Sequence, residues 1–172
     1  MKKLFALLLA LGMLCSFAMA EEAEAVELSW DSVSDETKAL GSLQQITIPD
    51  TVTLVYWVPQ NMDAVDVSAI GVDGLAAAFQ TADEAYTISV YAFAINWQEY
   101  LMGKGATEEN ARMIVTNSID AISFEQEEDG IDMVIIPVTE EITVVFAFTP
   151  LNGDEDWDAA KAAIVASIQA AE

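Results

Sequence analysis

The sequence predicts an α+β protein with an antiparallel sheet, built from two hairpins and a C-terminal meander, sandwiched with helices. Three observations carry this prediction. Two pairs of β-rich runs lie between residues 44 and 95, four more follow between 112 and 149, and helical patterns precede, interrupt and close the series. No repeat or flexible linker divides the chain, so residues 28–172 are expected to form a single domain.

The first twenty residues predict an export signal. A basic start at Lys2 and Lys3 precedes an apolar run over 4–14, and Ala18-Met19-Ala20 supplies the small residues of a cleavage site. The apolar run is well short of the ~20 residues that span a bilayer. We therefore expect cleavage after Ala20, no stable membrane insertion afterwards, and a secreted, periplasmic or extracellular protein of a bacterium.

Two further predictions concern the start of the chain. Lipidation at Cys15 is disfavoured, because Leu14 stands where a lipoprotein signal has Gly, Ala or Ser. Residues 21–27 are rich in glutamate and are expected to form an acidic, disordered leader.

Composition excludes several kinds of chemistry. The chain has no histidine, and its one cysteine lies in the signal, so Ser-His-Asp and Cys-His catalysis and the usual zinc sites are excluded. No cofactor is expected. Asp and Glu number 29 against 6 Lys and Arg, a formal charge of −23 that becomes −25 once Lys2 and Lys3 leave with the signal. Such a charge excludes nucleic acid as a partner and favours solubility.

The first half of the domain is expected to hold a helix and two hairpins. Helical spacing of Trp30, Val33 and Leu40 predicts a helix over 29–40. Strands are predicted at 44–48, 51–58, 75–81 and 86–95, with a loop containing one helical turn over 59–74.

A short helix and a meander are expected next. Asn96 can cap a helix that ends at Gly103. Strands are predicted at 112–116, 119–127, 131–138 and 142–149, and the alternation in the last one places its large side chains in the core. A final helix over 154–170 begins with acidic residues that suit its N-terminus, and its buried stripe is predicted to be Trp157, Ile164, Val165 and Ile168.

The C-terminal half resembles that of PsbP-like proteins, a family that includes small secreted bacterial proteins. Phe146, Phe148 and Pro150, followed by Ile164, Ser167 and Ile168, carry the match, together with the TNSIDAISF run over 116–124. The resemblance covers roughly residues 44–170. It implies an antiparallel sheet between helical layers and a binding or accessory role, and it brings no catalytic residues with it.

One candidate metal site lies at the start of the last helix. Asn152, Asp154, Asp156 and Asp158 alternate in a way that is typical of a calcium loop. However, Gly153 stands too early and no glutamate closes the loop. Capping of the helix explains the same residues, and both interpretations stay open.

A candidate ligand site lies around the second predicted strand. Trp57 is on the face opposite Tyr56, and Met62 follows in the loop, so these residues can line a groove for a small molecule, a glycan or a protein. Arg112 is either the partner of an exposed acidic residue or a holder of a ligand carboxylate.

These observations predict an exported, non-catalytic binding or accessory module. One alternative is a carboxylate-based glycoside hydrolase, for which the acidic cluster over 125–132 offers candidates. The other is a cell-surface structural or interaction protein that uses an exposed strand edge.

Overall fold

The computed structural model describes residues 25–171 as eleven strands and a few short helices. The helical elements are η1 (Trp30–Ser32), α2 (Asp35–Lys38), η2 (Val67–Ala69), α3 (Trp97–Gly103) and α4 (Glu155–Ser167). The strands are β1 (Val26–Leu28), β2 (Gly41–Ile48), β3 (Val52–Pro59), β4 (Met62–Ala64), β5 (Leu75–Thr81), β6 (Thr87–Phe93), β7 (Ala111–Thr116), β8 (Ile119–Gln126), β9 (Ile131–Pro137), β10 (Thr143–Thr149) and β11 (Gln169–Ala170).

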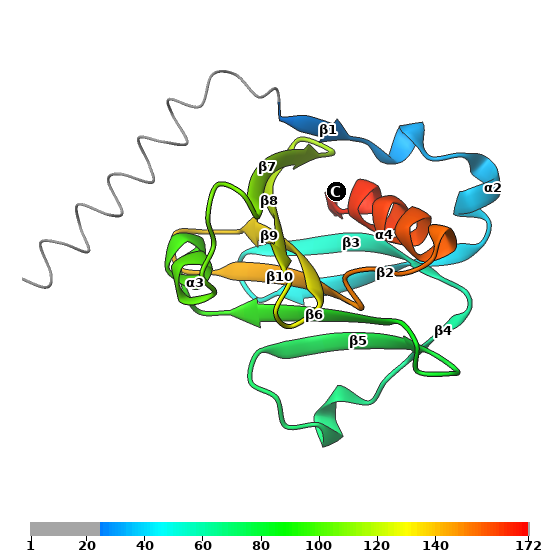
Figure 1. Cartoon of the computed structure of the whole chain (residues 1–172), viewed down its shortest axis with the longest axis horizontal. Helices are drawn as coiled ribbons and strands as arrows, with labels where there is room; N and C mark the ends of the chain where they lie inside the picture. Colours follow the sequence, from blue (N-terminus) through cyan, green and yellow to red (C-terminus); the bar gives the residue numbers. More distant parts are fainter. Residues whose placement is uncertain (1–24, 172) are drawn as a thin grey trace, which may run out of the picture.

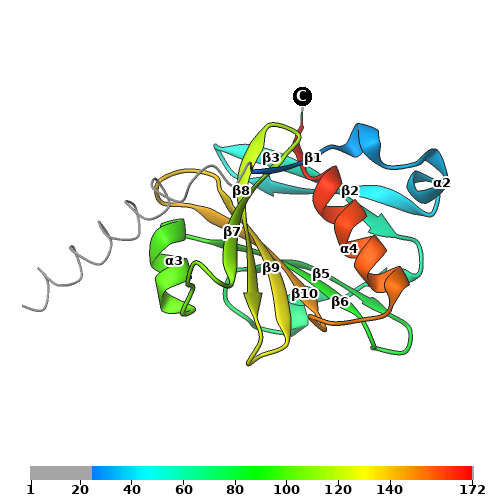
Figure 2. The same cartoon turned by 45° about the horizontal axis from the view of Figure 1, so that its top comes forward.

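The strands form two sheets (Figures 1 and 2). The large sheet has the order β1-β7-β8-β9-β10-β6-β5-β4, and all its pairs are antiparallel except β1 with β7. The small sheet has the order β11-β3-β2. The predicted α+β class is therefore confirmed, but the two predicted hairpins do not share a sheet. The hairpin of β5 and β6 extends the meander, and that of β2 and β3 forms a second layer.

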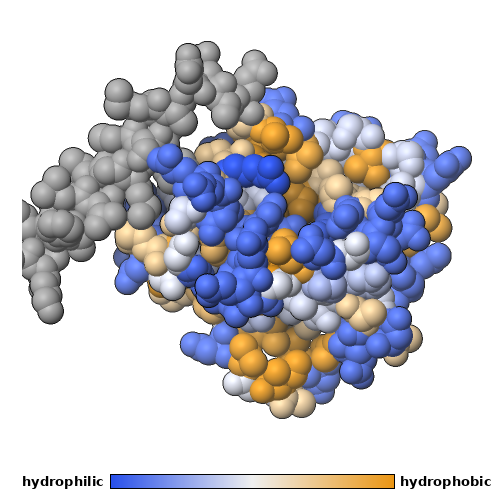
Figure 3. Space-filling view, in the orientation of Figure 1, coloured by the Kyte–Doolittle hydropathy of each residue, from blue (hydrophilic) through white to orange (hydrophobic). Residues whose placement is uncertain are grey.

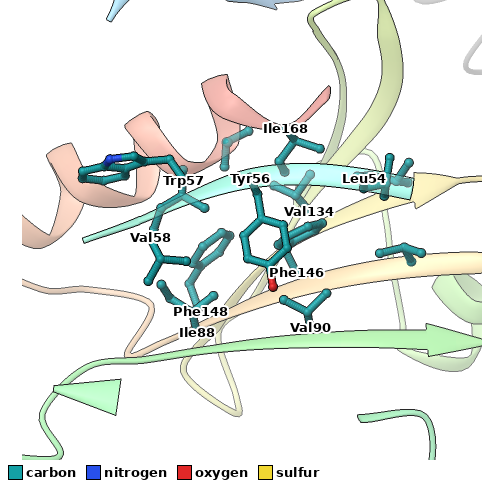
Figure 4. Close-up of a cluster of buried hydrophobic side chains, with 14 of the residues drawn as sticks. Leu54, Tyr56, Trp57, Val58, Ile88, Val90, Val134, Phe146, Phe148 and Ile168 are labelled. Atoms are coloured by element: carbon teal, nitrogen blue, oxygen red, sulfur yellow. The ribbon is translucent and has the colours of Figure 1, made fainter. Parts of the chain in front are cut away.

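The main core lies between the two sheets and also contacts α4. Val144, Phe146 and Phe148 of β10 are fully buried in it, opposite side chains of β3 (Figure 4). The ring of Tyr56 contacts Phe146 edge to face, with 5.1 Å between ring centroids. Large apolar and aromatic side chains therefore hold the two layers together.

A second core covers the opposite face of the large sheet. It joins Val145 and Ala147 of β10 to Phe124 and Ile135 of neighbouring strands, and Leu101 of α3 closes it. The prediction that the large side chains of β10 lie in the core is confirmed. The smaller side chains of Thr143, Val145 and Ala147 are buried as well, because β10 is a central strand with a cover on both faces.

The predicted helix over 29–40 is wrong. Ser29 and Ser34 each cap a separate short element, and Val33 between η1 and α2 is extended. The side chain of each serine accepts a hydrogen bond from a backbone N–H two or three residues later, so two short helical elements form in place of one longer helix. Order also begins two residues earlier than expected, because Val26 and Glu27 pair with β7.

The last helix ends earlier than predicted. Ile168 is extended, and the following residues pair with β3 as β11. The Oγ atom of Ser167 donates to Ile164 O and accepts from Trp57 N, so the helix ends where its side chain meets β3. The loop over 59–74 contains one helical turn, η2, as predicted, and in addition the short strand β4.

The caps of the two longer helices agree with the sequence. Asn96 Oδ1 accepts from Gln98 N at the start of α3, and Asp154 Oδ1 accepts from Trp157 N at the start of α4. None of the helices within residues 25–171 is long and apolar enough to cross a membrane. The predicted signal, its cleavage site and Cys15 lie outside the described residues.

Candidate functional site

A groove of about 900 Å³ runs along one side of α4. Its walls come from η1 and α2, the turn between β3 and β4, the tip of the hairpin of β5 and β6, and α4 itself. We call it the α4 groove. It is lined by Leu28, Ser32, Val33, Ser34, Thr37, Leu40, Trp57, Pro59, Gln60, Asn61, Met62, Thr81, Tyr86, Asp154, Asp156, Trp157, Ala159, Ala160, Ala162, Ala163 and Ala166.

The hollow arises because α4 presents small side chains to it. Five of the lining residues are alanines of this helix, at positions 159, 160, 162, 163 and 166, so that members three or four positions apart lie on one side of it. Large aromatic side chains stand at the two ends of the groove, so the groove is mainly apolar with a polar rim.

Trp157 forms one end of the groove. Its indole Nε1 donates to Pro150 O at 2.8 Å, and its ring stacks on Tyr86 with 4.8 Å between centroids. Gly153 lies directly against the indole ring, where a Cβ atom would overlap it. A glycine is therefore required at this point for the ring to reach its position.

Trp57 forms the other end, and it is only 3% exposed. Its backbone N–H donates to Ser167 Oγ at 2.7 Å, and its indole Nε1 donates to Lys38 O at 3.3 Å. Trp30 lies beside it, with 6.2 Å between ring centroids. These contacts fix the Trp57 ring as a wall between α4 and the segment that precedes β2.

The charge of the groove is negative. Its lining contains two carboxylates, Asp154 and Asp156, and no lysine or arginine. Asp154 accepts from Trp157 N at 2.8 Å and from the Tyr86 hydroxyl at 3.0 Å, and these hydrogen bonds lower the pKa of its carboxyl. The same bond to Asp154 raises the pKa of Tyr86. Asp154 is therefore held ionised at the rim.

The structure brings together two of the four predicted ligand-binding residues. Trp57 and Met62 line the α4 groove. Tyr56 points into the main core instead, where burial raises its pKa to about 12 (Figure 4). Arg112 lies on the surface of β7 outside the groove, and its Nη2 atom pairs with Glu125 Oε1 at 3.5 Å.

Sequence reasoning missed the side of the groove that α4 supplies. Tyr86 and Trp157 were assigned to a strand and a core stripe, and the alanines of α4 were given no role. The one sequence signal that indicates this wall of the groove is the run of alanines over 159–166, because their methyl side chains are too small to fill the space above a strand.

The four residues of the candidate calcium loop are not brought together. Asp154 caps α4, the Oδ1 atom of Asp158 pairs with Lys161 Nζ at 3.3 Å, and Asn152 lines a separate polar depression of about 510 Å³. Within residues 25–171 no group of three or more acidic side chains is placed to hold a metal ion. The geometry at this point is that of a helix cap.

A further exposed apolar feature lies on the loop before β5. Ile70 and Val72 are about half exposed, at 46% and 48%, and hydrophobic surface is visible at the lower edge of the molecule (Figure 3). Neither residue lines the α4 groove.

Comparison with known proteins identifies similar folds. No family model matches the chain, and no curated protein sequence matches it. It is similar to a solution structure of cyanobacterial PsbP (CyanoP) from Synechocystis sp. PCC 6803, with 12% identity, a TM-score of 0.48, and coverage of 76% of this chain and 93% of that one. It is also similar to a crystal structure from Bacteroides thetaiotaomicron VPI-5482, with 15% identity, a TM-score of 0.46, and coverage of 69% and 45%. The resemblance to PsbP-like proteins is thus also found in the structure, as a likeness of fold.

Proposed function

We propose that the protein is an exported, non-catalytic binding module that holds its ligand in the α4 groove. The observation that carries this proposal is the groove itself, which is hollow, apolar and bounded by two tryptophans whose indole N–H groups are already bonded to backbone carbonyls. A site of this kind binds through apolar contact, with the polar rim fixing orientation.

The lining also limits the charge of the ligand. An anion would enter a groove with two carboxylates and no basic side chain, in a protein whose formal charge is −23. A neutral or cationic molecule meets no such repulsion. The ligand is therefore a neutral or cationic compound with an apolar or aromatic surface, such as a peptide side chain or the C–H face of a sugar ring.

The carboxylates of the α4 groove do not favour the alternative of a glycoside hydrolase. Such an enzyme needs one carboxylic acid whose pKa is raised, so that it can protonate the leaving group. The two carboxylates of the groove are Asp154 and Asp156, and hydrogen bonds lower the pKa of Asp154. Asp154 is also committed to the helix cap. In the acidic cluster over 125–132, burial raises the pKa of Asp132, but its Oδ2 atom is paired with Lys161 Nζ at 3.4 Å.

A dye titration tests the proposal. N-phenyl-1-naphthylamine is neutral and apolar and becomes fluorescent in apolar surroundings, whereas anilinonaphthalene sulfonate has a similar body with a negative charge. We expect saturable fluorescence with the first dye and about tenfold weaker binding of the second. Glycans and peptides that displace the neutral dye then identify the ligand class.

A bulky substitution locates the dye. Ala162 is an exposed residue of α4 that lines the groove, so Ala162→Trp fills the hollow without disturbing the core. Ala76→Trp, at an exposed position of β5 outside the lining, is the matched control. Binding is expected to be lost with the first variant and kept with the second. Equal binding by both variants would show that the dye lies elsewhere and would contradict the proposal.

A further inference from the structure

Within residues 25–171, strand β2 has one side that pairs with no other strand. It is an outer strand of the small sheet and pairs only with β3, through eight regular antiparallel pairs from Gly41 with Pro59 to Ile48 with Val52. An outer strand of this length presents a row of free backbone groups.

Two hydrogen bonds of β3 show which residues of β2 face outward. Trp57 N donates to Ser167, and Thr53 O accepts from Ala171, so both residues direct their backbone away from β2. In an antiparallel ladder, when one residue directs its N–H and C=O away from the partner strand, the residue opposite it does the same. Leu43 and Thr47 are opposite these two, and therefore Gly41, Leu43, Gln45 and Thr47 direct their N–H and C=O groups to the free side.

The other outer strands of the two sheets are shorter than β2. The outer strands β1 and β4 have three residues each, and each carries an acidic residue, Glu27 or Asp63. Strand β11 has only two residues. Strand β2 has eight residues and no charge, and Leu43 on it is 51% exposed. Natural proteins rarely leave a long, uncharged edge strand open unless another chain adds to it.

We propose that the free edge of β2 binds an extended segment of a partner protein as an additional strand, and that this segment is uncharged in the middle and basic at its ends. The edge is neutral, and acidic side chains outnumber basic ones on both sides of it: Asp50 lies in the turn after β2, and α2 before it contains Asp35 and Glu36 against one Lys38. Basic residues at both ends of an added strand would meet these carboxylates.

A second copy of the chain fits the edge less well. In an antiparallel pairing of two β2 strands, the Asp50 end of each strand lies beside the α2 end of the other. Acidic ends then meet acidic ends, and each copy adds its formal charge of −23. Repulsion therefore disfavours this pairing relative to a basic segment.

Amide hydrogen exchange followed by NMR tests the proposal at single residues. The probe is a synthetic ten-residue peptide with two lysines at each end and alternating threonine and valine between them. In the free protein the amides of Leu43, Gln45 and Thr47 should exchange fast, and that of Ile46, which faces β3, should be protected. With excess peptide the first three should slow at least about tenfold, and Ile46 should change little.

A variant at the edge provides the control. Gln45→Pro removes an outward N–H and places a ring on the free side without removing a bond to β3, so the fold should persist and the peptide should no longer bind. Gln45→Thr keeps the N–H and should bind the peptide as the natural protein does.

Three results would overturn the proposal. The first is no protection at these amides in the presence of millimolar peptide. The second is equal protection by a peptide with glutamates in place of the lysines, which would contradict the basic partner. The third is protection that grows with protein concentration without peptide, which would identify a second copy as the occupant. This edge shares no residue with the α4 groove, so dye binding stays unchanged whichever result is found.

Discussion

The two ends of α4 are held by different chemistry. At its C-terminal end, neutral side chains from distant parts of the chain bond to the helix backbone, and Thr116 and Ser167 are fully buried there. At its N-terminal end, the exposed carboxylate of Asp154 caps the helix beside the α4 groove. The C-terminal end of α4 is therefore fixed in the core, while the N-terminal end borders the α4 groove and is exposed to solvent.

The C-terminal end is fixed by the turn between β7 and β8. Asn117 Nδ2 donates to Ala166 O at 2.8 Å and to Ile168 O at 2.9 Å, and its Oδ1 atom accepts from Trp30 N at 3.0 Å. The last carbonyl groups of a helix have no partner within the helix. Asn117 supplies partners for them and ties the N-terminal segment to the same point.

Loss of the Asn117 side chain is expected to have the largest effect. Asn117 has a positive φ of 45°, which glycine tolerates, so Asn117→Gly removes the side chain without adding backbone strain. Three hydrogen bonds are lost, and the free energy of unfolding should fall by about 3 kcal/mol. Urea denaturation measures this. A loss below about 0.5 kcal/mol would show that the turn does not hold the helix.

Ser167→Ala should have the next largest effect. The substitution leaves the N–H of Trp57 without its acceptor in a buried place, at a cost of about 2 kcal/mol. It should also loosen the Trp57 wall and weaken binding of the neutral dye. Ser42→Ala, at an exposed position of β2, is the control. If the two variants unfold at the same urea concentration, Ser167 does not anchor the helix to β3.

Thr116→Val should have a smaller effect. The side chains have nearly the same shape. The change removes the short hydrogen bond from Thr116 Oγ1 to Val165 O at 2.7 Å, together with two long contacts, to Ile168 O at 3.4 Å and from Asn117 Nδ2 at 3.5 Å. The expected loss is about 1 kcal/mol, measured by urea denaturation. Because the valine also fills the site, an increase in stability would mean that packing rather than hydrogen bonding fixes this end of α4.

The smallest effect is expected at Asp154, and it should depend on pH. Hydrogen bonds lower the pKa of its carboxyl in the folded protein. Its stabilisation is therefore fully present above the ordinary carboxyl pKa of 3.8, which applies in the unfolded chain, and is lost as the pH falls through the lower pKa of the folded protein. Asp154→Asn keeps a capping side chain but does not titrate. The stability advantage of the natural protein over this variant should shrink between pH 6 and pH 3, and a constant difference would contradict the assignment.

The sequence predicts the N-terminal end of α4 but not the C-terminal end. Acidic residues at a helix start form a local pattern, and Asp154 could be identified as the cap from its neighbours alone. Asn117 is 49 residues from Ala166, and nothing near either residue indicates that they meet. Contacts of this kind depend on the pairing of whole elements, which local periodicity does not specify.

The same limit explains the mixed result for the candidate site. The alternation in β3 separates Tyr56 from Trp57 correctly, but both faces of the strand are apolar, so the pattern could not show which residue borders the groove. Strand positions and the partners within the two hairpins and the meander were largely correct, but the division of the hairpins between two sheets was not predicted. The hairpin of β2 and β3 was predicted, whereas its separation into the small sheet depends on burial across two layers.

The most direct test of the α4 groove as a binding site is an NMR titration of the four indole N–H signals. Benzylamine, benzyl alcohol and benzoate each contain one phenyl ring and differ in charge. Together they test where the ligand binds and which ligand charge the groove accepts. Trp57 and Trp157 line the groove, whereas Trp97 starts α3 at the second core. We expect the signals of Trp57 and Trp157 to shift with benzylamine and benzyl alcohol, little shift with benzoate, and no shift of Trp97. A response confined to Trp97, or strongest with benzoate, would contradict the account.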